Sequence, residues 1–349
     1  MKIDVHLHLR GGPVTGRNPV RRLAHRVGEW YVHRGLRRGR ADDPGDDERA
    51  EAEALAALVA GSELDRAVAL AFDAVHDAAG APDPGRTYYC VPNDRTARIR
   101  DLAPDRLLFG ASVHPHRLDA LDELDRVRAL GAVLVKLLPN SHGFDPADPR
   151  HGPYWRRLAD LGLPLLIHGG FEHTVPAIDQ SFGDPARLRP ALDAGVTVIV
   201  AHCGGAGRLH RQETFGAFLE LAATYPNCFG DTSALANFWR SRYLFELLAP
   251  EALAARYPVV PDDPLSKLVH GSDYPVPVTP ATFAGHTPLA ARREILCRTR
   301  NPLQRDVELK RLAGLPDSVL ERGAEVLGLD DAGRARDRVR AVAVPRPVC

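Results

Sequence analysis

Two histidines near the start of the chain are spaced so that they can act on the same ligand. His6 and His8 lie in DVHLH, a pattern typical of a β-strand. Residues two apart in a strand share a face, so both imidazoles point to one side of the sheet and Val5 and Leu7 to the other. Imidazole is a common metal ligand, but single strand histidines also have structural roles. The pair by itself leaves both roles open.

Four other apolar runs also end in residues that can bind a metal or carry a charge. They are LVKLLP with Lys136, PLLIH with His168, VTVIVAH with His202 and VHGSD with Asp273. An apolar strand has no packing reason to end repeatedly in such residues, because each buried polar group needs a partner. A shared metal ion is a partner that would satisfy all of them.

Eight short β-rich runs alternate with helical segments along the chain. Amphipathic stretches such as DALDELDRVRAL, GPYWRRLADLGL and ETFGAFLELAATY separate some of them. This alternation predicts parallel βαβ units, and eight such units close an α/β fold of the (β/α)8 TIM-barrel type. The C-terminal strand ends of such a barrel converge on one site. The expected strands are 3–8, 64–72, 106–113, 132–138, 164–168, 196–202, 228–231 and 267–273.

One interval between the expected strands is much longer than the others. We interpret about 10–63 as a mostly helical insertion after the first strand, lying over the barrel mouth, within a barrel domain of residues 1–329. The insertion holds a basic stretch at 21–40, which we expect to be a solvated face paired with the adjacent acidic run, although it could also bind an anion. Residues 330–349 are expected to form a C-terminal tail.

Composition restricts the partners of this 349-residue chain. Lysine plus arginine and aspartate plus glutamate each total 45, so the net charge is zero and no global field attracts nucleic acid or an anionic membrane. No apolar run approaches the ~20 residues of a membrane span, and none resembles a signal peptide. Five cysteines without paired spacing predict reduced thiols. We expect a cytoplasmic protein.

The motifs HLH at 6–8, IHGG from Ile167, AHCGG from Ala201 and HGSDYPVP from His270 occur together over nearly the whole chain. In this set the chain resembles the amidohydrolase superfamily, and within it the amidohydrolase-related group of metal-dependent hydrolases and aminocarboxymuconate-semialdehyde-type decarboxylases. The resemblance implies a divalent metal cofactor, with zinc favoured over manganese and one or two ions. It also implies roles for five residues. His6, His8, His168 and Asp273 are metal ligands, and His202 is either a ligand of a second ion or a catalytic histidine.

Lys136 decides between one and two metal ions. In binuclear members of the superfamily a lysine at the end of the fourth strand is carboxylated and bridges both ions, and Lys136 lies on the expected fourth strand. The alternative is a cation that anchors substrate or pairs with a carboxylate. The motif around Asp273 resembles that of the mononuclear branch of the family, and this resemblance favours one ion. A departure from the family is Gly323, near the position of an expected asparagine, which puts details of barrel closure in doubt.

Several further residues are candidates for substrate binding. Arg10 follows the histidine pair and could hold a carboxylate, or simply lie exposed. Glu172 and His173 could reach the site or cap the next helix, and Asp231 could orient a metal-bound histidine. The candidates are Arg10, His114, His116, Glu172 and His173.

These residues predict a metal-dependent hydrolase that acts on a small-molecule amide, lactone or ester bond. Asp273 would accept the proton of the attacking water, and His202 would stabilise the oxyanion or orient the water. One alternative is a non-oxidative, metal-dependent decarboxylase of a small carboxylic acid. Another is an inactive barrel used for binding, against which the complete ligand set argues. We expect a small-molecule substrate, no nucleic acid and no membrane, and leave a homo-oligomer open.

Overall fold

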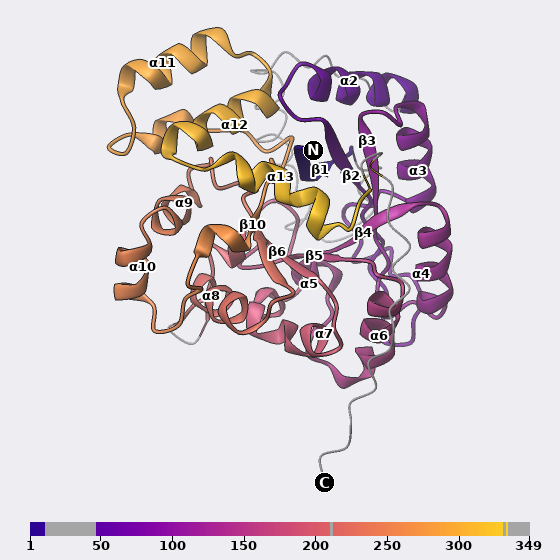
Figure 1. Ribbon diagram of the computed structural model, residues 1–349. Helices are drawn as coiled ribbons and strands as arrows, with labels where there is room; N and C mark the ends of the chain where they lie inside the picture. Colours follow the sequence, from indigo (N-terminus) through magenta and orange to yellow (C-terminus); the bar gives the residue numbers. More distant parts are fainter. Residues whose placement is uncertain (11–46, 210–211, 331–332, 334–349) are drawn as a thin grey trace.

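The computed structural model describes residues 1–10, 47–209, 212–330 and 333. Eight parallel strands form one nearly closed barrel with helices around it, which confirms the predicted TIM-barrel fold (Figure 1). Each strand falls within an expected run, and most are shorter because the ends turn into loops. In sheet order the strands are β1 (Ile3–His8), β2 (Arg66–Leu70), β3 (Leu107–Ala111), β4 (Ala132–Leu137), β5 (Leu165–His168), β6 (Val198–Ala201), β9 (Cys228–Asp231) and β10 (Leu268–Val269).

Backbone hydrogen bonds join the first strand to the segment that follows the last. The amide of Val5 donates to the carbonyl of His270 at 3.0 Å, and the amide of Asp273 donates to the carbonyl of His6 at 2.9 Å. The second bond joins two of the expected metal-binding residues directly. The seam of the barrel therefore lies at the candidate site.

Helices surround the barrel, and the three amphipathic stretches predicted to be helical are α4, α6 and α8 (Figure 1). Among the described residues, no helix is long and apolar enough to cross a membrane. A short hairpin of β7 (Arg208–Leu209) and β8 (Gln212–Glu213) precedes α8. The helices are α2 (Glu48–Ala60), α3 (Asn93–Leu102), α4 (Ala120–Ala129), α5 (Pro139–His142), α6 (Gly152–Asp160), α7 (Arg189–Asp193), α8 (Thr214–Thr224), α9 (Ser241–Leu247), α10 (Pro250–Arg256), α11 (Leu289–Arg298), α12 (Pro302–Ala313) and α13 (Asp317–Val326).

The described end of the long interval after β1 is helix α2. The carboxylate of Asp47 caps its first turn by accepting from the amides of Arg49 and Ala50 at 2.9 and 3.3 Å. The helix packs against α3 and occupies the place of the barrel helix between β1 and β2 (Figure 1). The basic stretch at 21–40 and nearly all of the tail lie outside the described residues. The domain boundaries and the place of the insertion stay predictions.

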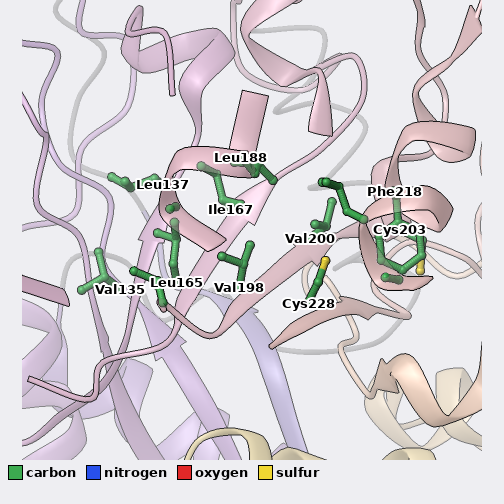
Figure 2. Packing of buried hydrophobic residues seen from close by; sticks show 14 of the residues in the cluster. Val135, Leu137, Leu165, Ile167, Leu188, Val198, Val200, Cys203, Phe218 and Cys228 are labelled. Carbon is green, nitrogen blue, oxygen red and sulfur yellow. The ribbon is translucent and has the colours of Figure 1, made fainter. Parts of the chain in front are cut away.

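Side chains of the strands alternate between two apolar clusters. Val135, Ile167 and Val200 belong to the cluster between the strands and helices, together with Phe218 of α8 and Cys228 (Figure 2). The inward cluster fills the barrel with the residues that alternate with these along the strands, such as Leu134, Leu166, Ile199 and Val269. Because side chains alternate in this way, the position of a residue along its strand determines whether its side chain can reach the barrel interior.

Helix α13 contacts both β1 and β10 and so covers the seam. A Cβ atom on Gly323 would lie 3.3 Å from Cβ of Ile3 and from Cγ1 of Val5. A glycine here lets the helix pack closely against β1. The residue that departs from the family pattern is therefore suited to barrel closure in this chain.

Candidate metal centre

Side-chain alternation along the strands points several of the predicted site residues into the barrel near its C-terminal end. Lys136 follows outward-facing Val135, and His168 follows outward-facing Ile167. On β1 the expected alternation is interrupted, because the register shifts between Asp4 and Leu7. Val5 belongs to the inward cluster and Leu7 to an outer one, so they do not share a face as expected. His6 and His8 lie on the side of β1 opposite Leu7. These residues are buried, apart from His8, whose side chain is 23% exposed. The barrel therefore brings together residues that lie far apart in the sequence.

Three ligand atoms converge where β1 meets the end of β10. Nε2 of His6 lies 3.1 Å from Nε2 of His8 and 3.4 Å from Oδ1 of Asp273, and the latter two atoms are 3.3 Å apart. Two donors that each bind one ion at about 2.1 Å, with angles between octahedral and tetrahedral, lie roughly 3.0–3.4 Å from each other. The spacing of the three atoms fits a single transition-metal ion.

Asp231 orients His6 and is itself fully engaged. Its Oδ2 lies 2.7 Å from Nδ1 of His6, and its Oδ1 accepts from the amides of His202 at 2.8 Å and Ser233 at 3.0 Å. The hydroxyl of Ser233 donates to the same oxygen. A second candidate ligand group of His6, His202 and Asp231 also exists. Because protein donors already occupy both oxygens of Asp231, we assign this residue to positioning and not to the metal.

The charge states around His6 favour ligation. Burial, with the nearby charge of Lys136, lowers the pKa of His6 to about 4, so the imidazole is neutral near pH 7. Burial alone would raise the pKa of Asp231, but the contact with His6 and its other hydrogen bonds hold that pKa well below its usual range. The carboxylate therefore accepts the Nδ1 proton of His6 and leaves the lone pair of Nε2 for a ligand.

His202 reaches the site through an unusual backbone conformation. Strand β6 ends at Ala201, whose side chain faces inward, so simple alternation would direct the next residue outward. His202 instead has a φ of +56°, which re-aims its ring. The ring centroid lies 5.0 Å from that of His168 and 5.4 Å from that of His6. Asp273 also has a positive φ, +63°, and such outliers cluster at functional sites.

The imidazole of His168 has a buried nitrogen without a protein partner. Within the part of the chain that the structure describes, its Nε2 makes no hydrogen bond, while Nδ1 lies 3.4 Å from Oε2 of Glu172. Burial, followed by the charges of Arg240 and Lys136, lowers the pKa of His168 well below its ordinary value. A buried polar atom left without a partner is costly. A metal ion on Nε2 would satisfy it.

Lys136 lies beside the same ligands. Its Nζ is 3.2 Å from Nε2 of His6, and the side chain is 2% exposed. Burial lowers the pKa of Lys136 to about 8. This position is compatible both with a ligand of a second ion and with a cation that holds substrate.

The other predicted substrate-binding residues lie in different surroundings. His114 is fully buried, and both of its ring nitrogens are engaged, with the carbonyl of His142 at 3.1 Å and the amide of His116 at 3.0 Å. This leaves it no nitrogen for substrate in the present conformation. The ring of His116 lies beside that of His151, with centroids 5.2 Å apart and the ring planes tilted by 33°. None of these ring contacts involves the converging ligands.

Arg10, Glu172 and His173 flank the site. The backbone of Arg10 is held by the side chain of Glu51, whose Oε1 accepts from its amide at 2.8 Å. Glu172 accepts backbone amides of its own loop and lies beside His168. The ring of His173 lies 6.4 Å from that of Trp239. Their roles in substrate binding stay predictions.

Two residues that sequence reasoning missed are important for the site. Arg240 is 7% exposed, and its charge lowers the pKa values of His168 and His202, after burial. A Cβ atom on Gly271 would lie 2.9 Å from Cβ of His6 and 3.1 Å from Cβ of Ser233. Nothing in NFWRSRY separates Arg240 from a surface arginine, whereas the place of Gly271 inside HGSD was a usable signal.

Comparison with known proteins agrees with this geometry. The model of the amidohydrolase family matches residues 3–297. No curated protein matches the chain. Similar solved structures match over 94% of this chain and 99% of their own length, and at 14–16% identity this likeness shows a shared fold alone. They include an uncharacterized TIM-barrel protein of Bordetella bronchiseptica (TM-score 0.54, 16% identity), a protein named as a probable 2-pyrone-4,6-dicarboxylic acid hydrolase of Acinetobacter baumannii (0.52, 15%) and a 5-carboxyvanillate decarboxylase of Sphingomonas paucimobilis (0.52, 14%).

Proposed function

This chain belongs to the amidohydrolase family, and from that membership we propose that it is a metal-dependent hydrolase of a small-molecule amide, lactone or ester. Family members are generally metal-dependent and act on small molecules. The observation that supports the proposal is the convergence of His6 Nε2, His8 Nε2 and Asp273 Oδ1 at separations of 3.1–3.4 Å. This arrangement lies where active sites of such barrels are found.

In the proposed site, His6, His8, His168 and Asp273 hold the metal ion. Imidazole and carboxylate ligands suit zinc, with manganese as the alternative. His202 and Lys136 are the residues available for a second ion. The bound ion supplies Lewis acidity, which makes water a stronger nucleophile near neutral pH and polarises a substrate carbonyl.

Asp273 and His202 are placed to accept the proton of the attacking water and to orient that water. Burial would raise the pKa of Asp273, but the hydrogen bond with His8 and the charges of both strand histidines lower it. Asp273 is therefore a carboxylate at neutral pH and can accept a proton from water and return it to the leaving group. The carbonyl of Ser233 lies 3.0 Å from Nδ1 of His202 and can only accept, so Nε2 of His202 keeps its lone pair and can orient the water.

The substitution Asp273→Asn tests the proton-transfer role. The amide keeps the shape and one oxygen of the side chain but loses most of its basicity. We expect turnover to fall by about 10²–10⁴-fold while the thermal midpoint stays nearly unchanged. Asp193→Asn, a surface carboxylate bound to the Tyr225 hydroxyl, is the matched control. Turnover within a few-fold of wild type with metal retained would assign the proton to another group.

A decarboxylase is the second candidate, favoured by two buried cations. Nζ of Lys136 lies 3.2 Å from Nε2 of His6, and Arg240 donates to the carbonyl of Phe171 in the loop after His168. Positive charge of this kind suits a substrate that carries a carboxylate. The decarboxylase of Sphingomonas paucimobilis shares the fold. Product analysis separates the two reactions, because aromatic or unsaturated acids would release carbon dioxide, whereas amides, lactones and esters would release an amine, alcohol or acid. A metal-loaded protein without turnover on either panel would favour a binding barrel.

A further inference from the structure

His116 and His151 form a pair of histidines outside the candidate metal centre. The first lies in the loop after β3, and the second ends the helical turn Pro149–His151, which leads into α6. Their ring centroids lie 5.2 Å apart, and the ring planes are tilted by 33°. The fold thus brings together two imidazoles that are separated by 35 positions in the sequence.

Three ring nitrogens of this pair are buried without a hydrogen bond to any described residue. They are Nδ1 of His116 and both nitrogens of His151. His151 is only 3% exposed. A buried histidine normally uses one ring nitrogen as a donor and the other as an acceptor, because an unpaired polar atom is costly to bury. The pair therefore has nitrogens available for a ligand that imidazole can bind.

The separation of the two rings fits a shared metal ion. When an imidazole nitrogen binds an ion at about 2.1 Å, the ring centroid lies roughly 3.2 Å from that ion. Two such rings at a tetrahedral angle have centroids about 5.2 Å apart, which is the spacing of His116 and His151. His6 and His8, whose Nε2 atoms lie 3.1 Å apart, have centroids 4.9 Å apart. The second pair thus resembles the first in its spacing.

The charges around the pair suit a cation. Burial lowers the pKa of His116, and burial together with the charge of His116 lowers the pKa of His151 to about 4, so both rings are neutral near pH 7. The carboxylate of Asp148 acts on both rings in the opposite direction, which places a negative charge near them. Asp148 pairs with Arg150, whose side chain is 69% exposed, and such a surface pair is weak. The carboxylate can therefore also attract a divalent ion.

Backbone contacts and packing hold both rings in place. The amide of His116 donates to Nδ1 of His114 at 3.0 Å, and the amide of His151 donates to the carbonyl of Asp148 at 3.0 Å. Both rings also contact the ring of Phe144, with centroids 6.4 and 5.6 Å away. Because the two loops are already ordered, an ion that binds here has little conformational entropy to remove.

We propose that His116 and His151 bind a divalent transition-metal ion such as zinc, at a second site separate from the candidate metal centre. Imidazole nitrogen is a ligand that these ions prefer. Among residues 1–10, 47–209, 212–330 and 333, no third histidine, cysteine or carboxylate converges on the pair, so water completes the coordination. The site is therefore weaker than one with four protein ligands, and it fills only when zinc is added. Zinc taken up in this way does not indicate a binuclear centre with Lys136.

Zinc is the probe, added to the full chain after purification without chelators and measurement of its metal content. Calorimetry gives the number of further equivalents and their dissociation constants in the wild type, His116→Gln and His151→Gln. We expect the wild type to bind one equivalent that each variant binds at least about 10-fold more weakly, because even the loss of a group behind a ligand typically costs that much. Glutamine keeps a polar side chain but removes the imidazole.

His286→Gln is the matched control. This histidine is exposed and stacks on Phe245, with centroids 3.7 Å apart, so its loss should leave zinc uptake unchanged. Thermal midpoints identify any variant that fails to fold. A second measurement leaves both histidines intact. The ring of Trp155 lies 6.1 Å from that of His151, so added Co²⁺ should quench its fluorescence, and Trp155→Phe should lose this quenching while it keeps the affinity for zinc.

The double variant His6→Ala with His8→Ala separates this site from the candidate metal centre. It should still bind the added equivalent of zinc, because neither substituted residue belongs to the pair. If this variant loses that equivalent, the added ion binds at the candidate centre and the inference is wrong. The inference is also wrong if folded His151→Gln binds added zinc as tightly and in the same number as wild type, or if Co²⁺ leaves the fluorescence of Trp155 unchanged.

Discussion

Oδ2 of Asp231 lies 2.7 Å from Nδ1 of His6, although 225 residues separate them in the sequence. The contact connects the end of β9 to β1 across the interior of the barrel. It determines which nitrogen of His6 keeps a lone pair for a ligand. A metal-binding histidine usually has such an acceptor behind it.

Asp231→Asn should weaken metal binding without removing a ligand. The amide can no longer accept the Nδ1 proton as a charged group, so His6 loses both its orientation and part of its basicity. We expect the dissociation constant for zinc, measured by chelator competition, to rise about 10- to 100-fold. Unchanged affinity in a folded variant would mean that Asp231 does not orient the ligand. Asp193→Asn again serves as the control.

Gly271→Ala should damage the site by steric pressure. The new Cβ would lie 2.9 Å from Cβ of His6 and 3.1 Å from Cβ of Ser233, so one of these residues must shift. We expect a loss of about 1–3 kcal/mol in the free energy of unfolding, together with weaker metal binding. Gly152→Ala is the control, because its nearest contact is a flexible Arg156 side chain at 3.4 Å. Metal affinity equal to wild type would show that the site tolerates the shift.

A buried ion pair supports the floor of the site. Nζ of Lys310 donates to Asp306 at 2.5 Å and to the carbonyl of Gly271 at 2.9 Å, and both side chains are 1% exposed. Lys310→Met leaves the carboxyl group without its cation, and we expect urea unfolding to show a loss of about 3–5 kcal/mol. Replacing both residues, Asp306→Leu with Lys310→Met, should recover much of that loss. A double variant no more stable than the single one would contradict this account.

The loss in Lys310→Met should also depend on pH. Burial raises the pKa of Asp306 to about 7, even with the cation present. A carboxyl group whose folded-state pKa is raised destabilises the protein as the pH rises from about 4 to that pKa. In the wild type this fall ends near pH 7. Without Lys310 the pKa is higher still, so the variant should keep losing stability at pH 8 and above. A pH-independent difference would be inconsistent with this assignment.

Glu63 should contribute stability that acid removes. Hydrogen bonds from Arg311 at 2.5 and 2.6 Å and from Lys2 at 2.8 Å lower its pKa to about 2. A depressed carboxyl pKa stabilises the fold above the ordinary value near 4.5, and this contribution disappears as the pH falls towards 2. Near pH 7 we expect Glu63→Gln to lose about 1 kcal/mol, because the site is partly exposed. Urea titrations of wild type and variant should converge as the pH drops towards 3, whereas exposed Glu294→Gln should show no such trend.

The barrel and much of its site could be predicted because both follow from local patterns. Lys136 and His168 lie at the ends of apolar runs, and the alternation of strands with helices predicts parallel strands whose C-terminal ends meet at one face of the barrel. His202 was also expected in the site, but alternation does not explain how it arrives there. Its ring enters through a positive φ at the end of β6, a feature of the folded backbone that residue types do not reveal.

The surroundings of Arg240 and His114, in contrast, could not be predicted from the sequence. Burial of an arginine without an acidic partner depends on loops that come together only in the folded chain, so Arg240 looked like any other charged residue. His114 was close to a strand end, but its two nitrogens are used by neighbouring backbone groups. Long-range packing determines both results, and sequence spacing carries little information about it.

Metal content is the most direct test of the central claim that His6, His8, His168 and Asp273 hold a metal ion. The wild type, the double variant His6→Ala with His8→Ala, and the control Arg242→Gln are purified without chelators and analysed for transition metals. We predict one or two equivalents of zinc or manganese in the wild type and the control, and near-complete loss in the double variant. A wild type without metal, whose thermal midpoint does not rise when zinc or manganese is added, would contradict the account.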